Sequence, residues 1–294
     1  NTAFISIKIQ GAINSTHNNR RFQMKVISFL NNKGGVGKTA STATVAHMIS
    51  AVYNKKVLLI DMDPQGNCSS LFSQINTLDL FVNLLNDIPN YSEEKTVEDL
   101  LLDSELDIHK AIKKTEYNNL DIIPALLTLS ECEERLKADI RTPQQFRLKA
   151  HLDKIADEYD YCLIDCSPSI NILNINALVA SNEVYIPLKC DAWSATGMCI
   201  ARKLVKTVSS YNNNLKLAGC FFTVWEGQKN VSKTTYDLIS SLLSDLVLPV
   251  KISKSKLVEE LSYTKIPLLI YDNGKTKSKV TQDYLDLTKY IVEH

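Results

Sequence analysis

The sequence predicts an α/β fold: a doubly wound, mostly parallel sheet with helices on both faces. Short, nearly continuous apolar runs alternate along the chain with longer amphipathic stretches, which is typical of parallel strands buried on both faces and joined by crossover helices. A glycine-rich loop also separates the first apolar run from the first long helical stretch. Such a turn is where a doubly wound sheet receives an anionic ligand.

The individual elements follow from periodicity. Strands are expected where β-branched and aromatic residues form short runs between turn residues, at residues 25–30 (KVISFL), 56–61 (KVLLID), 120–124 (LDIIP), 160–165, 183–188 (EVYIPL) and 217–224 (LAGCFFTV). Helices are expected where apolar residues recur at helical spacing, at residues 38–53, 96–103, 142–157, 170–181, 195–211, 231–243 and 278–292. No internal repeat interrupts this order, so we expect one domain over residues 24–294.

Composition excludes several classes of protein. The 294 residues carry 33 Lys and Arg against 33 Asp and Glu, and 45% of them are hydrophobic, which argues against a disordered chain and against a protein coated with positive charge. No apolar run approaches the roughly 18 residues of a membrane helix, and the start lacks the layout of a signal peptide. We therefore expect a cytoplasmic protein without a membrane contact.

Two features are expected to carry no chemistry. Residues 1–23 begin with Asn and turn polar towards Arg20 and Arg21, which predicts a flexible N-terminal arm or an expression remnant, with a short strand or a basic arm as the alternative. The seven cysteines are scattered without a CxxC pair, which favours reduced thiols over disulfides or a metal site.

The loop Asn32 to Thr39 (NKGGVGKT) is the strongest functional signal. It lies between an expected strand and an expected helix, where glycines let backbone N–H groups converge on phosphate oxygens beside the positive end of the helix dipole. We expect Lys38 to contact the β- and γ-phosphates and the Thr39 hydroxyl to ligate Mg²⁺. The predicted nucleotide-binding residues are Lys33, Gly34, Gly35, Val36, Gly37, Lys38, Thr39 and Ala40.

Carboxylates follow two further expected strands. Asp61 and Asp63 stand at the end of one, and Asp165 ends the apolar run YCLID. Because the carboxyl ends of parallel strands meet at one edge of the sheet, these side chains should face the glycine-rich loop. Asp165 there can hold Mg²⁺ through water opposite Thr39.

These motifs resemble those of the ParA/MinD/Soj group of P-loop ATPases. KGGVGKT matches the deviant Walker A form, with Asn32 where the common pattern has Gly; LLIDMDPQGN matches LLxDxDPQGN; and Asp165 to Pro168 matches DxxP. The resemblance implies ATP and Mg²⁺ as cofactors, a dimer in which Lys33 reaches the partner's nucleotide, and slow hydrolysis. It also implies that Lys33, Lys38 and Asp63 are catalytic, with Asp63 orienting water. By the same resemblance, Thr39, Asp61 and Asp165 are the metal-site residues, and Asp61 helps to hold the metal shell.

The end of the chain separates branches of this group. Residues 282–294 carry Tyr284, Leu287 and Ile291 at helical spacing and more acids than lysines, which favours a docked helix over the basic amphipathic membrane helix of MinD-like proteins. Residues 249–280 carry 7 Lys and 3 acids. They resemble the ParA segment that binds DNA without sequence preference. The resemblance implies DNA contacts by Lys251, Lys254, Lys256 and Lys265, and the same surface could extend to Lys275, Lys277 and Lys279. The alternative is a solvated lysine-rich face.

The expected function is therefore DNA partition, of a plasmid or a chromosome. By resemblance, the partner is a ParB-type centromere-binding protein. The stretch 86–139 carries 14 acids against 6 Lys and Arg. This acidic stretch could bind a basic segment of the partner; the alternative is an ordinary solvated surface. Association with the bacterial nucleoid would follow. The alternatives are a MinD-like positioning ATPase, and a nucleotide-gated binding protein or co-regulator with negligible turnover.

Overall fold

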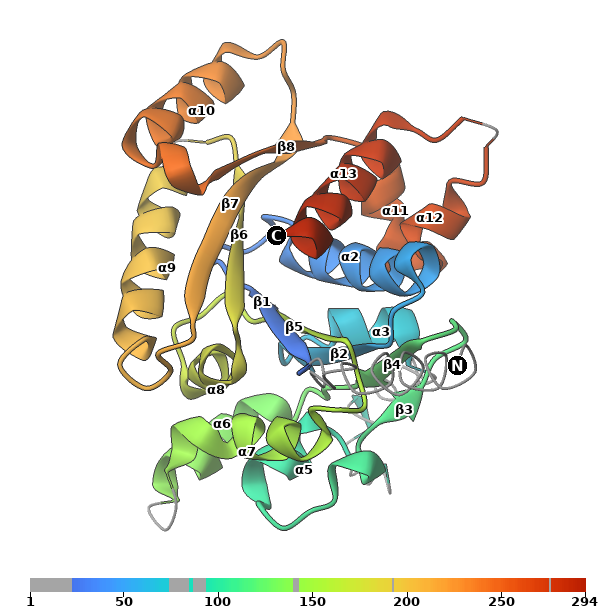
Figure 1. Ribbon diagram of the computed structural model, residues 1–294, viewed down its shortest axis with the longest axis vertical. Coiled ribbons are helices and arrows are strands. Elements are labelled where there is room, and N and C mark those ends of the chain that lie inside the picture. Colours follow the sequence, from blue (N-terminus) through green and yellow to red (C-terminus); the bar gives the residue numbers. More distant parts are fainter. Residues whose placement is uncertain (1–22, 74–84, 87–93, 140–142, 192, 275) are drawn as a thin grey trace, which may run out of the picture.

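An eight-stranded sheet runs through the molecule in the order β3-β4-β2-β5-β1-β6-β7-β8 (Figure 1). The computed structural model describes residues 23–73, 85–86, 94–139, 143–191, 193–274 and 276–294. The strands are β1 Lys25–Phe29, β2 Val57–Met62, β3 Lys113–Lys114, β4 Leu120–Ile123, β5 Tyr161–Cys166, β6 Glu183–Lys189, β7 Lys216–Trp225 and β8 Val247–Ser253. Every pairing is parallel except the short one between β3 and β4.

Helices connect and flank these strands. The α-helices are α2 Lys38–Tyr53, α3 Asn67–Phe72, α5 Val97–Leu102, α6 Leu129–Ala138, α7 Arg147–Leu152, α8 Ile172–Ala180, α9 Ser194–Val208, α10 Asn230–Leu242, α11 Lys256–Thr264, α12 Leu268–Tyr271 and α13 Lys279–Glu293. Short 3₁₀ turns lie at Ile108–Lys110, Gln144–Phe146, Asp153–Ile155 and Ser244–Leu246.

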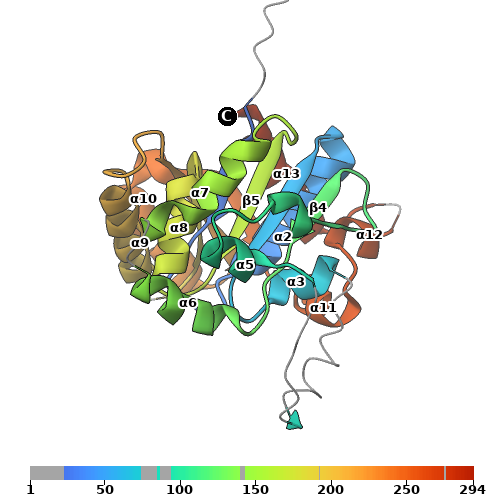
Figure 2. The same ribbon diagram turned by 90° about the horizontal axis from the view of Figure 1, so that it is seen from below.

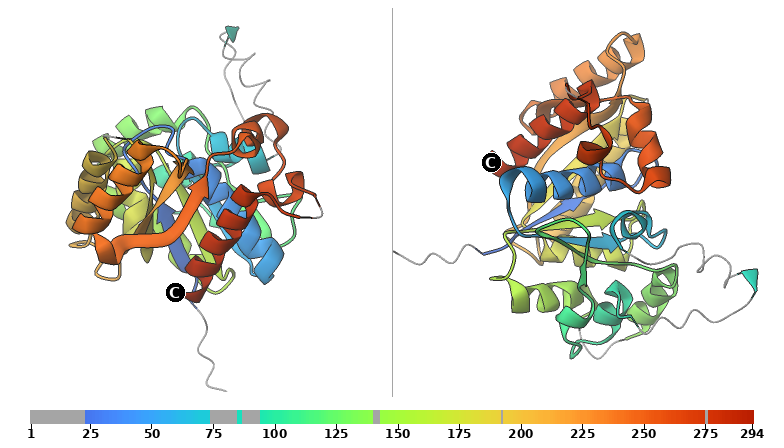
Figure 3. Two further views of the ribbon diagram at one scale, coloured as in Figure 1. Left: turned by 90° about the horizontal axis from the view of Figure 1, so that it is seen from above. Right: turned by 90° about the vertical axis from the view of Figure 1, so that its right-hand side faces the viewer.

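The two faces of the sheet bury separate cores. Alternate residues of one strand point to opposite faces, so Ile27 and Phe29 of β1 pack with α2 and α13, whereas Val26 belongs to the core under α5 to α9. Figures 2 and 3 show α2 and α13 on one side of the strands and α7, α8 and α9 on the other. This confirms the predicted doubly wound architecture.

The six predicted strands are present, and two further strands were not predicted. β3 is only two residues long, which leaves no pattern to detect. β8 contains Pro249, alternates irregularly in burial and forms one edge of the sheet. Proline is tolerated at sheet edges because its missing N–H is not needed there, so it weakens a prediction without preventing the strand.

The helix predictions were correct for the long elements and wrong for one segment. The stretch 142–157 is one short helix, α7, between two 3₁₀ turns rather than a continuous helix, and its first residue lies outside the described part of the chain. The short helices α3 and α12 and the polar helices α6 and α11 were not predicted. The C-terminal helix is docked as expected, because Tyr284, Leu287 and Ile291 of α13 are buried.

The parallel register brings the carboxyl ends of the central strands together. β5 lies between β2 and β1, and Asp165 is in register with Asp61 on one side and with Phe29 on the other. The loop after β1 therefore opens beside both carboxylates. This is the edge of the sheet where doubly wound proteins place their ligands.

Candidate functional site

The loop between β1 and α2 is fixed by neighbouring strands. Asn31 Nδ2 donates to the Pro187 carbonyl at 2.8 Å, and Asn31 Oδ1 accepts the Lys33 N–H at 3.0 Å. The Thr223 hydroxyl donates to the Val36 carbonyl at 2.9 Å. β6 and β7 thus hold the loop in place from one side, and neither Asn31 nor Thr223 was predicted from the sequence.

Two glycines give the loop its shape. Gly35 and Gly37 have φ values of 66° and 79°, a left-handed conformation that glycine adopts without the steric cost of a Cβ. Gly37 is the N-cap of α2 and supplies no side-chain acceptor, so the first N–H groups of the helix stay available to a ligand. Gly34 and Gly35 are exposed, which leaves the loop open to an anion.

Lys38 begins α2 and is directed back along the loop. Its side chain is buried, and its Nζ donates to the Lys33 carbonyl at 3.1 Å. Burial lowers the pKa of Lys38, while Asp165 and Asp63 act to raise it. Thr39 and Ala40 follow in the same turn and are half-buried. The predicted loop residues are therefore contiguous around one buried ammonium group.

Asp165 has an unsatisfied carboxylate oxygen. Its Oδ1 accepts the Thr42 hydroxyl at 3.3 Å, whereas Oδ2 is buried with no hydrogen-bond partner in the described part of the chain. Burial raises the pKa of Asp165 well above its usual range and Asp61 raises it further, while the Thr39 hydroxyl and the Lys38 ammonium oppose this. A cation at Oδ2 would compensate for the buried charge, so these residues fit a hard divalent ion.

Asp61 is already engaged within the protein. Its Oδ1 accepts the Asp63 N–H at 3.1 Å, and its Oδ2 accepts the Ser69 N–H and hydroxyl at 2.7 and 2.8 Å. Burial raises the pKa of Asp61 to about 6 despite these bonds. Asp61 therefore organises the turn that carries Asp63.

Asp63 lies on that turn, close to the buried ammonium. It is buried, its Oδ1 accepts the Gln65 N–H at 3.0 Å, and it is one of the charges that act on the pKa of Lys38. The structure thus brings Lys38, Asp61, Asp63 and Asp165 together at one edge of the sheet, as the sequence predicted.

Lys33 faces away from this cluster within the single chain. Its ammonium forms an ion pair with Asp191, which follows β6. Asp191 Oδ1 also accepts the N–H of Trp193, a side chain with 71% of its surface exposed. The Lys33–Asp191 pair was not predicted, because only the fold brings these two residues together.

The lysines predicted to contact DNA have different environments. Lys251 Nζ lies over two rings, 4.6 Å from the centroid of Trp225 and 3.6 Å from that of Tyr236. Lys254 and Lys256 are exposed at the start of α11, and Lys254 Nζ is 4.0 Å from Glu226. Lys251 is therefore held by cation–π contacts, whereas Lys254 and Lys256 project to solvent.

Further along this segment, the lysines serve local structure. Lys265 is the exposed C-cap of α11 with a φ of 53°. Lys277 Nζ donates to the Leu269 carbonyl at 3.1 Å, and Lys279 forms an ion pair with Asp283. Lys275 lies outside the described residues. Of the described lysines in residues 249–280, four are thus exposed (Lys254, Lys256, Lys265 and Lys279) and two are half-buried (Lys251 and Lys277).

Part of the acidic stretch 86–139 is also internal. Glu98 is buried and accepts the Leu126 N–H at 2.8 Å. Arg147 pairs with Asp139 at 2.7 Å, and Asp99 closes the capping box of α5 with Thr96. The charge counted along the sequence therefore overstates the charge that this region presents to a partner.

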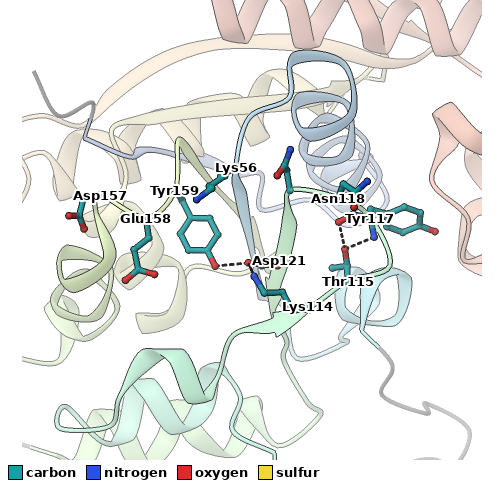
Figure 4. Close-up of a pocket in the computed structure, with 10 residues that line it drawn as sticks. Lys56, Lys114, Thr115, Tyr117, Asn118, Asp121, Asp157, Glu158 and Tyr159 are labelled. Atoms are coloured by element: carbon teal, nitrogen blue, oxygen red, sulfur yellow. Dashed lines mark hydrogen bonds and ion pairs between the residues drawn. The ribbon is translucent and has the colours of Figure 1, made fainter. Parts of the chain in front are cut away.

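A cavity opens at the opposite, amino edge of the sheet (Figure 4). It has a volume of about 530 Å³ and is lined by side chains of β3, of β4 and of the segments just before β2, β4 and β5. At its centre, Asp121 Oδ2 accepts both Lys114 Nζ and the Tyr159 hydroxyl at 2.7 Å. We refer to this cavity as the amino-edge pocket; its central charge is satisfied by the protein itself.

Comparison with known proteins agrees with this geometry. A family model described as an AAA domain matches residues 24–217. The chain is 32% identical over 268 residues to the sporulation initiation inhibitor protein Soj of Bacillus subtilis, covering 91% of this chain and 98% of the relative. It is 33% identical to the chromosome-partitioning ATPase Soj of Treponema pallidum, covering 84% and 90%.

A solved structure extends the likeness to three dimensions. A plasmid partition protein of Borrelia burgdorferi bound to AMPPNP superimposes with a TM-score of 0.71 at 25% identity, over 92% of this chain and 99% of that one. Within the described part of this chain, no helix combines the length and apolarity needed to cross a membrane. The family model and the Soj relatives each cover more than half of the chain, which therefore belongs to the ParA/Soj family of P-loop partition ATPases.

Proposed function

We propose that this protein is an ATPase of DNA partition that works with ATP and Mg²⁺. The buried Asp165 Oδ2, which lacks a hydrogen-bond partner among the described residues beside the loop 32–39, is the observation that carries the proposal. The relative of Borrelia burgdorferi was solved with an ATP analogue, which supports the same class of ligand here. We also infer one ATPase domain over residues 24–294; the arm expected over residues 1–23 lies, except for its last residue, outside the described residues.

The roles of the site residues follow from their places. The N–H groups of residues 34–40 and the Lys38 ammonium would hold the phosphates, and Thr39 with Asp165 would hold the metal. Bound Mg²⁺ supplies charge neutralisation between the phosphates. Asp63, buried beside Lys38 on the turn organised by Asp61, would orient the attacking water.

The single chain keeps Lys33 on Asp191. We infer that ATP binding drives formation of a homodimer in which Lys33 leaves this ion pair and reaches the partner's nucleotide. The pair is about one-third exposed on both side chains, so its rupture costs little, on the order of 1 kcal/mol or less. In this proposal a ParB-type partner accelerates an otherwise slow turnover.

DNA binding belongs to the same proposal. The exposed lysines Lys254 and Lys256 suit phosphate contacts that are independent of base sequence and sensitive to salt. Nucleoid association in a bacterial cytoplasm would follow from such binding. The cation–π contacts of Lys251 suggest that it supports this surface rather than contacting DNA.

The test is DNA binding by the purified protein with ATP, with ADP and without nucleotide, across a salt series. We expect binding only with ATP, with an affinity that falls steeply as salt rises. Lys254→Ala/Lys256→Ala should weaken it about 10-fold or more, because each lost phosphate contact reduces the salt-dependent affinity. Lys203→Ala, a change at an exposed lysine of α9, is the matched control. Binding that is equal in all nucleotide states would contradict the proposal.

A further inference from the structure

Lys189 lies against the phosphate loop from the neighbouring strand. It is the last residue of β6, in register with Thr223 of β7, whose hydroxyl holds the Val36 carbonyl. A Cβ placed on Gly35 would lie 3.8 Å from Lys189 Nζ. The ammonium is therefore beside the exposed middle of the loop, on the side opposite the carboxylates of β2 and β5.

Among the residues that the structure describes, no acid pairs with this ammonium. Within the described residues, Lys189 Nζ makes no hydrogen bond or ion pair, although its side chain is half-buried. The nearest acid in sequence, Asp191, is already occupied: its Oδ2 pairs with Lys33, and its Oδ1 accepts the Trp193 N–H and the Ser194 hydroxyl. A partly desolvated cation without a partner is unfavourable unless an anion joins it.

We propose that Lys189 is a third cation of the nucleotide site and contacts the terminal phosphates of ATP within its own subunit. This inference rests on the proposed function and specifies how the site is charged. Lys38 reaches the loop from the first turn of α2, and Lys189 reaches it from the end of β6. Because Lys33 is held by Asp191 in the single chain, Lys189 would supply the second positive charge before any dimer forms.

A lysine suits this position for a physical reason. Its flexible stem carries a point charge that can follow a phosphate without a fixed geometry. The glycine at 35 leaves the space between the ammonium and the loop open, and its φ of 66° disfavours a side chain that would fill it. The terminal phosphate carries the charge that distinguishes ATP from ADP, so the contact should favour ATP.

The test measures equilibrium binding of ATP and ADP, with Mg²⁺, to the full-length protein. Lys189→Gln should weaken ATP binding about 10- to 100-fold and ADP binding less, with a melting temperature without nucleotide that is no lower than that of the wild type. Lys189→Arg, which keeps the charge, should retain most of the affinity. Lys203→Gln, at an exposed lysine of α9, should bind as the wild type does.

The outcomes separate this inference from the proposed function. If Lys189→Gln binds ATP as tightly as the wild type while Lys38→Met does not bind, the inference is wrong and the ATP site stands. If Lys189→Arg loses as much affinity as Lys189→Gln, the charge argument is overturned. If the wild type itself binds no ATP, both this inference and the proposed function fail.

Discussion

At the carboxyl edge of the sheet, Asp165 keeps one buried oxygen without a partner and Lys189 keeps an ammonium without one, among the residues that the structure describes. At the amino edge, Asp121 accepts both Lys114 and Tyr159 at 2.7 Å. Both edges carry buried or half-buried charge. The difference is that the amino edge neutralises its charges internally, which stabilises the fold, whereas the carboxyl edge leaves charges for a ligand to satisfy.

Loss of Asp63 should give the largest effect at the carboxyl edge. We expect Asp63→Ala to lower ATP hydrolysis about 100-fold or more, because a positioned acid–base group contributes this much, while ATP binding is retained. Phosphate release with saturating ATP is the measurement, and Asp121→Asn is the control with unchanged hydrolysis. Hydrolysis at the wild-type rate in Asp63→Ala would remove this residue from the chemistry and favour a nucleotide-gated binder.

The two adjacent carboxylates should respond in opposite directions. Asp165→Asn removes a buried charge with an unsatisfied oxygen, so it should raise the free energy of unfolding by about 1 kcal/mol and abolish the Mg²⁺ dependence of ATP binding. Asp61→Asn keeps only one acceptor oxygen, so either the Asp63 N–H or the Ser69 donors lose their acceptor, and it should lower stability by about 2–3 kcal/mol. Urea unfolding without nucleotide measures both. Equal destabilisation by the two changes would contradict the distinction.

A buried histidine beside the amino-edge pocket predicts a pH dependence. His47 packs against Tyr117, a pocket residue, with ring centroids 5.0 Å apart, and burial lowers the pKa of His47 to about 4. In the unfolded chain, His47 takes up a proton near pH 6.5, whereas in the folded protein it stays neutral down to about pH 4. The contribution of neutral, buried His47 to the free energy of unfolding is therefore fully present above pH 6.5 and is lost as the pH falls to about 4.

His47→Phe removes this proton linkage. The unfolding free energy of the wild type, relative to the variant, should fall by about 3 kcal/mol between pH 6.5 and 4. Urea titrations at several pH values measure the difference, and a constant difference across this range would show that His47 is not sequestered.

Within the amino-edge pocket, the expected effect is on stability alone. Asp121→Ala leaves the Tyr159 hydroxyl without its acceptor and should lower stability by about 2 kcal/mol, with ATP affinity unchanged. Lys114→Ala is the matched control, because its side chain is 84% exposed and an exposed pair contributes about 1 kcal/mol or less. A loss of ATP binding in Asp121→Ala would show that the two edges are coupled.

The parts of this site that the sequence predicted are contiguous or lie at strand ends. Lys38 was predicted from the glycine-rich loop alone. Asp61 and Asp165 were predicted because parallel strands end at a common edge of the sheet. Asn31, Thr223 and Asp191 contact the loop or its lysine through tertiary structure alone. The only sequence signal for Lys189 and Thr223 is a polar residue at or near the end of an apolar strand.

The differences in the fold have similar causes. β8 was not predicted because it contains Pro249; it is an edge strand, where a missing backbone N–H donor is tolerated. The segment 142–157 has apolar residues at helical spacing, yet it breaks into α7 and two 3₁₀ turns, and the Asn176 side chain accepts the Leu148 N–H at 3.2 Å. Lys251 was expected on the surface, but Trp225 and Tyr236, from other elements, hold its ammonium. Spacing along the chain contains none of these tertiary contacts.

The most direct test of the account is calorimetric titration of ATP, with and without Mg²⁺, into the wild type, Lys38→Met and Asp121→Asn. We predict tight, Mg²⁺-dependent binding to the wild type and to Asp121→Asn, and a loss of about 100-fold or more in Lys38→Met, since a buried charged contact is removed. Binding that survives in Lys38→Met, or that is lost in Asp121→Asn, would contradict the assignment of ligand binding to the carboxyl edge.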